Sequence, residues 1–147
     1  MEHCPSFTAP ATSGQSITLP GSGLTVLYFY PKDNTPGCTT QATGFRDHHA
    51  AFAAANVTIV GVSRDSLKSH ENFKAKYELP FELISDPEET VCNLFAVMKL
   101  KNMYGKQVRG IERSTFVIDS AGNILKAWRG LKVPGHVEEV LAFVNTI

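Results

Sequence analysis

The stretch of sequence that decides the fold is LTVLYFYPKDNTPGCT, residues 24–39. It opens with an almost continuous apolar run, Leu24–Tyr30, which is typical of a buried β-strand. A turn rich in proline, asparagine and glycine follows and ends the strand. Thr35 can then act as the N-cap of a helix, with Pro36 in the first position, where its missing N–H costs nothing. The stretch therefore predicts a strand, a turn and a helix whose first turn contains Cys38.

This placement would change the chemistry of the Cys38 thiol. A free cysteine with a pKa of about 8.5 is about 3% thiolate at pH 7, and the thiolate is the nucleophile. Lowering the pKa to about 6 requires about 3.4 kcal/mol of preferential stabilisation of the anion. A helix N-terminus contributes at most about 2 kcal/mol. We therefore expect an arginine or a lysine from elsewhere in the chain to hydrogen-bond to the sulfur.

The Thr35 hydroxyl is a second candidate partner for the thiol. A threonine hydroxyl has one donor and two acceptor sites, so it can accept from the Cys38 N–H and donate to the sulfur. The alternative is that Thr35 is only a helix cap and Cys38 only a small buried apolar residue.

Three of these residues also form a known pattern. Pro31, Thr35 and Cys38 match Pro-x-x-x-Thr-x-x-Cys, and the chain resembles the peroxiredoxins, in particular the bacterioferritin-comigratory or peroxiredoxin Q group. Residues 61–66, 102–106 and 110–116 resemble later segments of the same group. The resemblance implies an α/β, thioredoxin-like fold of the peroxiredoxin type, with a central mixed β-sheet, flanking helices and extra N-terminal strands.

The resemblance also implies a role for each matching residue. Cys38 would be the peroxidatic cysteine that attacks a hydroperoxide in antioxidant defence, and Thr35 would orient the thiolate and the peroxide. Pro31 would shield the pocket from water. Arg113, in the matching string Gly110–Phe116, would be the required cation, because a guanidinium stays charged and donates to two atoms at once. We expect no cofactor and no metal, since the five histidines and three cysteines show no ligand spacing.

The cysteine that would reduce the oxidised Cys38 is missing from its usual places. Many members of the group carry it five residues after the first cysteine, where this chain has Thr43, or in the following helix, where Lys74 corresponds. Cys92 lies beside an apolar stripe and reads as buried and inert. Cys4 lies near a terminus that we expect to be mobile, where it is either an exposed bystander or able to reach another subunit.

We therefore expect a one-cysteine peroxidase that is recycled by an external thiol, such as thioredoxin, glutaredoxin with glutathione or another small thiol. The alternative is a two-cysteine mechanism with Cys92 or Cys4 as the resolving cysteine. A thiol–disulfide oxidoreductase is a rival reading, but the motif lacks the second cysteine of Cys-x-x-Cys. A holdase that kept only the fold is another rival, although it would not need Thr35 and Arg113.

Length and charge suit a compact enzyme. The 147 residues fit one domain, residues 1–147, and 14 basic residues balance 14 acidic ones, so nothing favours nucleic acid or a membrane surface as a partner. We expect no secretory signal, because no basic segment leads into an apolar one at residues 1–5. Sparse, unpaired cysteines favour a reducing cytoplasm. A monomer and a dimer both remain open.

Periodicity predicts alternating strands and helices. We expect strands at residues 15–19, 24–30, 57–62, 82–85, 114–118 and 124–128, and helices at 37–55, 66–77, 87–97 and 135–146. The basic segment 99–109 has four positive charges and no negative ones. We expect it to be a solvated loop, or alternatively a docking surface for an acidic reductase.

Overall fold

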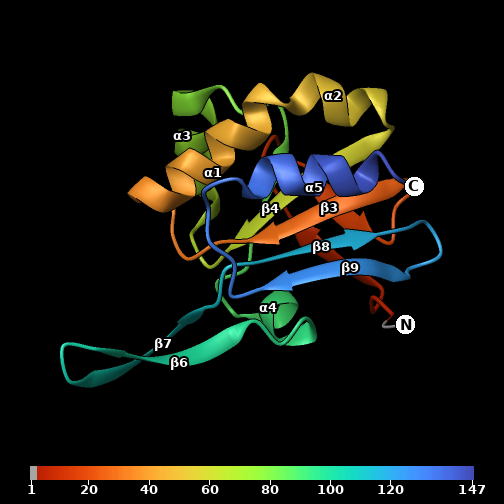
Figure 1. The fold of residues 1–147 in the computed structure, drawn as a ribbon. Helices are drawn as coiled ribbons and strands as arrows, with labels where there is room; N and C mark the ends of the chain where they lie inside the picture. The colour runs from red at the N-terminus through yellow and green to blue at the C-terminus, as the bar shows by residue number, and fades with distance from the viewer. Residues whose placement is uncertain (1–2) are drawn as a thin grey trace.

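A computed structural model describes residues 3–147, and a five-stranded mixed sheet lies at its centre (Figure 1). The strands run in the order β5-β4-β3-β8-β9. Strand β3 pairs in parallel with β4, and β4 with β5, whereas β8 is antiparallel to both β3 and β9. Their bounds are β3 Leu24–Phe29, β4 Val57–Ser63, β5 Glu82–Ser85, β8 Ser114–Ile118 and β9 Ile124–Arg129. The expected mixed sheet and its strands are confirmed.

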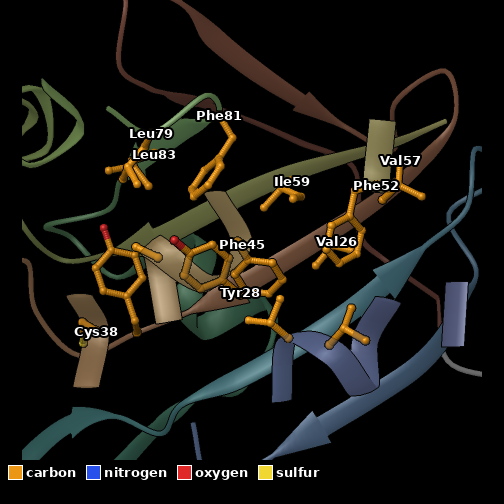
Figure 2. Packing of buried hydrophobic residues seen from close by; sticks show 14 of the residues in the cluster. Val26, Tyr28, Cys38, Phe45, Phe52, Val57, Ile59, Leu79, Phe81 and Leu83 are labelled. Atoms are coloured by element: carbon orange, nitrogen blue, oxygen red, sulfur yellow. The ribbon is translucent and has the colours of Figure 1, made fainter. Parts of the chain in front are cut away.

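Four helices pack an apolar cluster against one face of the sheet. Strand residues alternate between the two faces, so that Val26 and Tyr28 join this cluster while Leu27 and Phe29 join the cluster on the other face. Figure 2 shows Tyr28 beside Phe45 of a covering helix, with ring centroids 4.8 Å apart. The helices are α1 Pro36–Asp47, α2 His49–Ala54, α3 Leu67–Tyr77 and α5 His136–Val144.

The opposite face is covered by an N-terminal hairpin and a short helix. Strands β1, Phe7–Pro10, and β2, Ser16–Leu19, pair antiparallel. The helix α4, Thr90–Leu94, contributes to the same cluster. Strand β2 confirms the expected strand at 15–19. Within residues 3–147, no helix combines the length and apolar character that crossing a membrane requires.

Two helix predictions are wrong in extent. The helix expected at 37–55 is divided at His48, whose ring nitrogen Nδ1 lies 2.9 Å from the Gly44 carbonyl oxygen. The helix expected at 87–97 is only the five residues of α4, because Glu89 and Ala96 on either side adopt positive φ angles of 63° and 55°. Left-handed backbone cannot continue an α-helix.

The loop expected at 99–109 is instead a β-hairpin. Strands β6, Met98–Met103, and β7, Lys106–Ile111, pair antiparallel as a two-stranded sheet that projects away from the central one (Figure 1). Leu100 on this hairpin is 67% exposed and Tyr104 at its tip is fully exposed. Solvent reaches both faces of this hairpin, so apolar and polar residues do not alternate along its strands. Without that alternation the sequence does not predict a strand.

Candidate active site

Cys38 is the third residue of α1, as the sequence predicted. Thr35 is the N-cap residue, with extended backbone angles φ −78° and ψ 152°, and Pro36 begins the helix. The Cys38 side chain is 1% exposed, at one end of the apolar cluster (Figure 2). The thiol therefore lies in the first helical turn, where unpaired backbone N–H groups and the helix dipole favour an anion.

Arg113 places its guanidinium against the Cys38 sulfur. Its Nη2 donates to Cys38 Sγ at 3.4 Å, across 75 positions of sequence. Arg113 lies in the short connection between β7 and β8, and the first residue of β8, Ser114, pairs with Phe29, the last residue of β3. The start of β8 thus lies beside the strand end that leads to α1. Sheet register therefore brings Arg113 to Cys38.

Gln41 belongs to the site but was missed from the sequence. Its Oε1 accepts a hydrogen bond from Arg113 Nη1 at 2.7 Å, and its side chain is fully buried. Residues three apart share a helix face, so Gln41 lies one turn along α1 from Cys38. The sequence does contain a signal for this residue. Gln41 is a polar residue on the otherwise apolar face of α1 that also carries Cys38 and Phe45.

Gly37 leaves room for the guanidinium. A Cβ atom at this position would lie 3.2 Å from Arg113 Nη2, which is closer than ordinary van der Waals contact. Any larger residue would therefore press against the group that donates to Cys38.

Thr35 does not make the expected bonds to Cys38. Its hydroxyl donates to the Lys32 carbonyl oxygen at 2.8 Å, and its side chain makes no capping hydrogen bond to α1. The bond to Lys32 uses the single proton of the hydroxyl, so the hydroxyl does not also donate to the Cys38 sulfur. Pro31 is half-buried in the same turn. Its shielding role stays a prediction.

The other two cysteines lie on the opposite face of the sheet from Cys38. Cys4 and Cys92 are both fully buried in the cluster beneath β1, β2 and α4, whereas Cys38 belongs to the cluster under α1. The prediction of an exposed or mobile Cys4 is wrong, because its N–H donates to the Gly122 carbonyl oxygen at 2.6 Å. Cys92 is buried as expected.

Burial also makes these two thiols poor nucleophiles. It raises the pKa of Cys4, and it raises the pKa of Cys92 strongly, with a further contribution from the Asp86 carboxylate beside it. Because the thiolate is the reactive form, both side chains are suited to packing rather than to exchange.

A second polar cluster lies under the turn that precedes Cys38. Asp33, Asp65 and His70 are the group among the described residues with metal-ligand spacing, and each of them makes hydrogen bonds within the protein. Burial acts to raise the pKa of Asp33, yet hydrogen bonds from His70, Tyr30 and Ser69 outweigh it and hold the pKa below its ordinary value. Asp33 is therefore ionised.

Tyr28 lies in the same region, and its hydroxyl keeps its proton near neutral pH. Its hydroxyl is buried without a hydrogen-bond partner among residues 3–147. Burial raises its pKa well above the ordinary range, and the neighbouring Cys38 and Asp33 raise it further.

The sequence is similar to that of known proteins over most of its length. The chain matches the AhpC/TSA family over residues 1–127. It is 56% identical over 117 residues to peroxiredoxin Bcp of Xanthomonas campestris, covering 80% of this chain and 73% of the relative. It is 54% identical over 116 residues to peroxiredoxin Bcp of Bacillus subtilis, covering 79% and 74%.

Solved structures of related peroxiredoxins share this fold. The bacterioferritin comigratory protein of Xanthomonas campestris, studied for its alkyl peroxide reduction activity, superposes with a TM-score of 0.91 at 47% identity, covering 95% of this chain and 90% of that one. A peroxiredoxin Q mutant from Xylella fastidiosa superposes with a TM-score of 0.92 at 42% identity, covering 99% and 96%. These matches confirm the thioredoxin-like fold of the peroxiredoxin type. The chain therefore belongs to the AhpC/TSA family and is a peroxiredoxin, a thiol peroxidase enzyme.

Proposed function

We propose that Cys38 reduces hydrogen peroxide and organic hydroperoxides, and that an external thiol restores it. The observation that carries this proposal is the position of Cys38 Sγ, in the first turn of α1 and 3.4 Å from Arg113 Nη2. Two sources of positive potential meet at one sulfur, as the thiolate requires.

The first step is attack of the Cys38 thiolate on the nearer oxygen of the hydroperoxide. A sulfur–oxygen bond forms to the hydroxyl oxygen of the peroxide, which keeps its hydrogen, and the O–O bond breaks. The leaving alkoxide or hydroxide takes a proton from water and departs as an alcohol or water. Cys38 is oxidised to a sulfenic acid while the peroxide is reduced by two electrons. Arg113 can donate to the sulfur and to a peroxide oxygen together, which aligns the reactants and stabilises the moving charge.

In the second step an external thiol attacks the sulfenic sulfur and releases water, which leaves a mixed disulfide on Cys38. A second thiol then attacks this disulfide and regenerates the Cys38 thiol. We propose thioredoxin, or glutaredoxin with glutathione, as the source of these thiols, in a reducing cytoplasm. The burial of Cys4 and Cys92 on the far face of the sheet supports this one-cysteine mechanism over an internal disulfide.

Thr35 and Pro31 have supporting roles in this proposal. Thr35 closes the turn before α1 through Lys32 and so holds the start of the helix in place. Pro31, half-buried in that turn, limits the approach of water to the sulfur.

The test is consumption of hydrogen peroxide and of an alkyl hydroperoxide with thioredoxin, glutaredoxin–glutathione or dithiothreitol as the reductant. Wild type should turn over and Cys38→Ser should be inactive while it remains folded. An equally active Cys38→Ser variant would rule out the proposal. Reduction of insulin disulfides at a rate comparable with peroxide consumption would favour the thiol–disulfide oxidoreductase instead.

A further inference from the structure

Asp33 fastens the loop that carries Cys38 to the rest of the fold. Between Tyr30 and Cys38 it is the residue whose side chain is buried, while its neighbours Lys32 and Asn34 are exposed. Within residues 3–147, the hydrogen bonds that join residues 31–35 to Tyr30, to Asp65 in the loop after β4 and to α3 all involve Asp33. The position of this loop therefore depends on what holds Asp33.

Three side chains hold the Asp33 carboxylate. The Tyr30 hydroxyl donates to Oδ1 at 2.7 Å, and the Ser69 hydroxyl donates to Oδ2 at 2.8 Å. His70 Nδ1 lies 2.7 Å from the same Oδ2. The backbone N–H of Asp33 in turn donates to Asp65 Oδ2 at 2.9 Å. Of the three, His70 is the one that is itself completely buried in α3.

His70 faces an acceptor on each side of its ring. Nδ1 meets the ionised Asp33, and Nε2 lies 2.9 Å from the carbonyl oxygen of Ile84 in β5. A carboxylate oxygen only accepts, so the bond to Asp33 requires a proton on Nδ1. The ring links β5, a strand of the central sheet, to the loop before Cys38.

We propose that His70 is a positioning residue for the peroxidase reaction: anchored on β5, it fixes Asp33 and thereby the start of α1, where Cys38 meets Arg113. His70 touches neither the sulfur nor the peroxide site, and it acts through Asp33. The inference rests on the proposed function of Cys38. Since a misplacement of about 1 Å costs about 100-fold in rate, loss of the bond from His70 to Asp33 should slow the reaction by about 10- to 100-fold.

Two conservative variants separate positioning from mere structural support. In His70→Asn the amide nitrogen stands where Nδ1 was and can still donate to Asp33, but it cannot reach Ile84. In His70→Gln the amide nitrogen stands where Nε2 was and can still donate to Ile84, but Asp33 loses the donor that residue 70 provides and keeps only Tyr30 and Ser69. Both variants replace the same buried ring with an amide, so a general loss of stability affects both.

The readouts are the second-order rate of Cys38 oxidation by hydrogen peroxide and the rate of Cys38 alkylation by iodoacetamide. We expect both rates in His70→Asn to stay near wild type and both in His70→Gln to fall by about 10- to 100-fold. Equal rates in the two variants, whether both fall or neither does, would overturn the inference. Nitrogen-15 NMR of wild type should show a proton on His70 Nδ1, the atom that faces Asp33, and an unprotonated Nδ1 would also overturn the inference.

Milder variants cover the case in which His70→Gln does not fold. Ser69→Ala removes a donor to the same Asp33 oxygen from a half-buried position, and it should lower both rates measurably; unchanged rates would count against the inference. Lys74→Met is the matched control. It removes an ion pair between α3 and Glu82 of β5 that does not reach the loop, so both rates should be unchanged. Because alkylation needs no peroxide, it tests the inference even if the wild type failed as a peroxidase.

Discussion

Gln41 Oε1 accepts a hydrogen bond from Arg113 Nη1 at 2.7 Å, one helical turn along α1 from Cys38. The same guanidinium uses Nη2 to reach the Cys38 sulfur. Gln41 therefore holds the arginine in the orientation that meets the Cys38 sulfur, and makes no hydrogen bond to the sulfur itself.

Gln41→Leu should lower the rate of Cys38 oxidation by about 10-fold, because a hydrogen bond to a charged group contributes about 1.5–3 kcal/mol. Stopped-flow measurement with hydrogen peroxide gives this rate. Gln107→Leu is the control, because Gln107 is exposed on β7, and it should leave the rate unchanged. A Gln41→Leu enzyme as fast as wild type would show that Arg113 needs no support.

Gly37→Ala should raise stability and lower activity together. Alanine is favoured over glycine within a helix by up to about 1 kcal/mol, but its Cβ would press on Arg113 Nη2 from 3.2 Å. We expect a several-fold slower reaction with peroxide and an equal or higher free energy of unfolding in urea. Gly110→Ala is the matched control, since nothing lies within 4 Å of its added Cβ. If Gly110→Ala slowed the reaction with peroxide as much as Gly37→Ala does, the steric explanation would be wrong.

Cys4→Ala and Cys92→Ala should keep peroxidase activity with an external thiol. Each should lose some stability, because both side chains pack in the core. Mass spectrometry after graded peroxide treatment should show a mixed disulfide or sulfinic acid on Cys38. Loss of turnover in either variant, together with an intrachain disulfide to Cys38 in wild type, would establish the two-cysteine mechanism.

His136 should make the protein less stable in mild acid. Burial lowers its pKa below the ordinary value of 6.5, Glu139 opposes this shift, and Arg113 adds to it. The unfolded chain therefore binds a proton that the folded protein resists, and the free energy of unfolding falls as the pH drops below about 6.5. The stabilisation that comes from a neutral, buried His136 is fully present above that pH.

His136→Gln tests this dependence, because its amide nitrogen can stand where His136 Nε2 meets the Thr115 hydroxyl at 2.9 Å. Urea unfolding at a series of pH values between about 7 and 5 should give a shallower slope for the variant than for wild type. Parallel slopes would show that other groups cause the acid sensitivity.

The basic hairpin gives a prediction about the reductase. Cross-strand pairing of Lys99 with Gly110, and of Met103 with Lys106, places Lys99, Lys101 and Lys106 on one face of the hairpin. Lys101 Nζ donates to the Ile111 carbonyl oxygen, so its reversal would also disturb the hairpin. Reversing Lys99 and Lys106 to glutamate should raise the apparent KM for an acidic reductase protein but leave that for peroxide unchanged.

Gln107→Glu is the control for the hairpin, because Gln107 pairs with Asn102 on the opposite face. It adds a negative charge without touching the lysine face. If the double reversal leaves the KM for the reductase unchanged, the hairpin is a solvated ribbon rather than a docking surface.

Local signals were sufficient to predict the elements that place Cys38. The apolar run of β3, the turn and Pro36 each act within a few residues, and the structure has strand, turn and helix in that order. The cation at the sulfur followed from the free energy that a thiolate needs. That it is Arg113 followed from the resemblance, since nothing local distinguishes this arginine from a surface one.

Non-local contacts account for what the sequence did not reveal. The bond between Gln41 and Arg113 spans 72 positions, and the bond between Asp33 and His70 spans 37. Neither leaves a periodic pattern. Thr35 was predicted to bond to Cys38, but the nearby Lys32 carbonyl takes its only proton, a competition that depends on the exact turn. Cys4 is held in place by a backbone hydrogen bond to Gly122, a residue that is distant in the sequence.

The most direct test of the account is the second-order rate of Cys38 oxidation by hydrogen peroxide in wild type and in Arg113→Met, with the fold of both checked by circular dichroism. Methionine keeps much of the volume of the arginine stem and removes the donor to the sulfur. The account predicts a fall of about 100-fold, because a charged hydrogen bond worth about 1.5–3 kcal/mol is lost in a buried site. A rate for Arg113→Met within about two-fold of wild type, a difference of only about 0.4 kcal/mol, would contradict it.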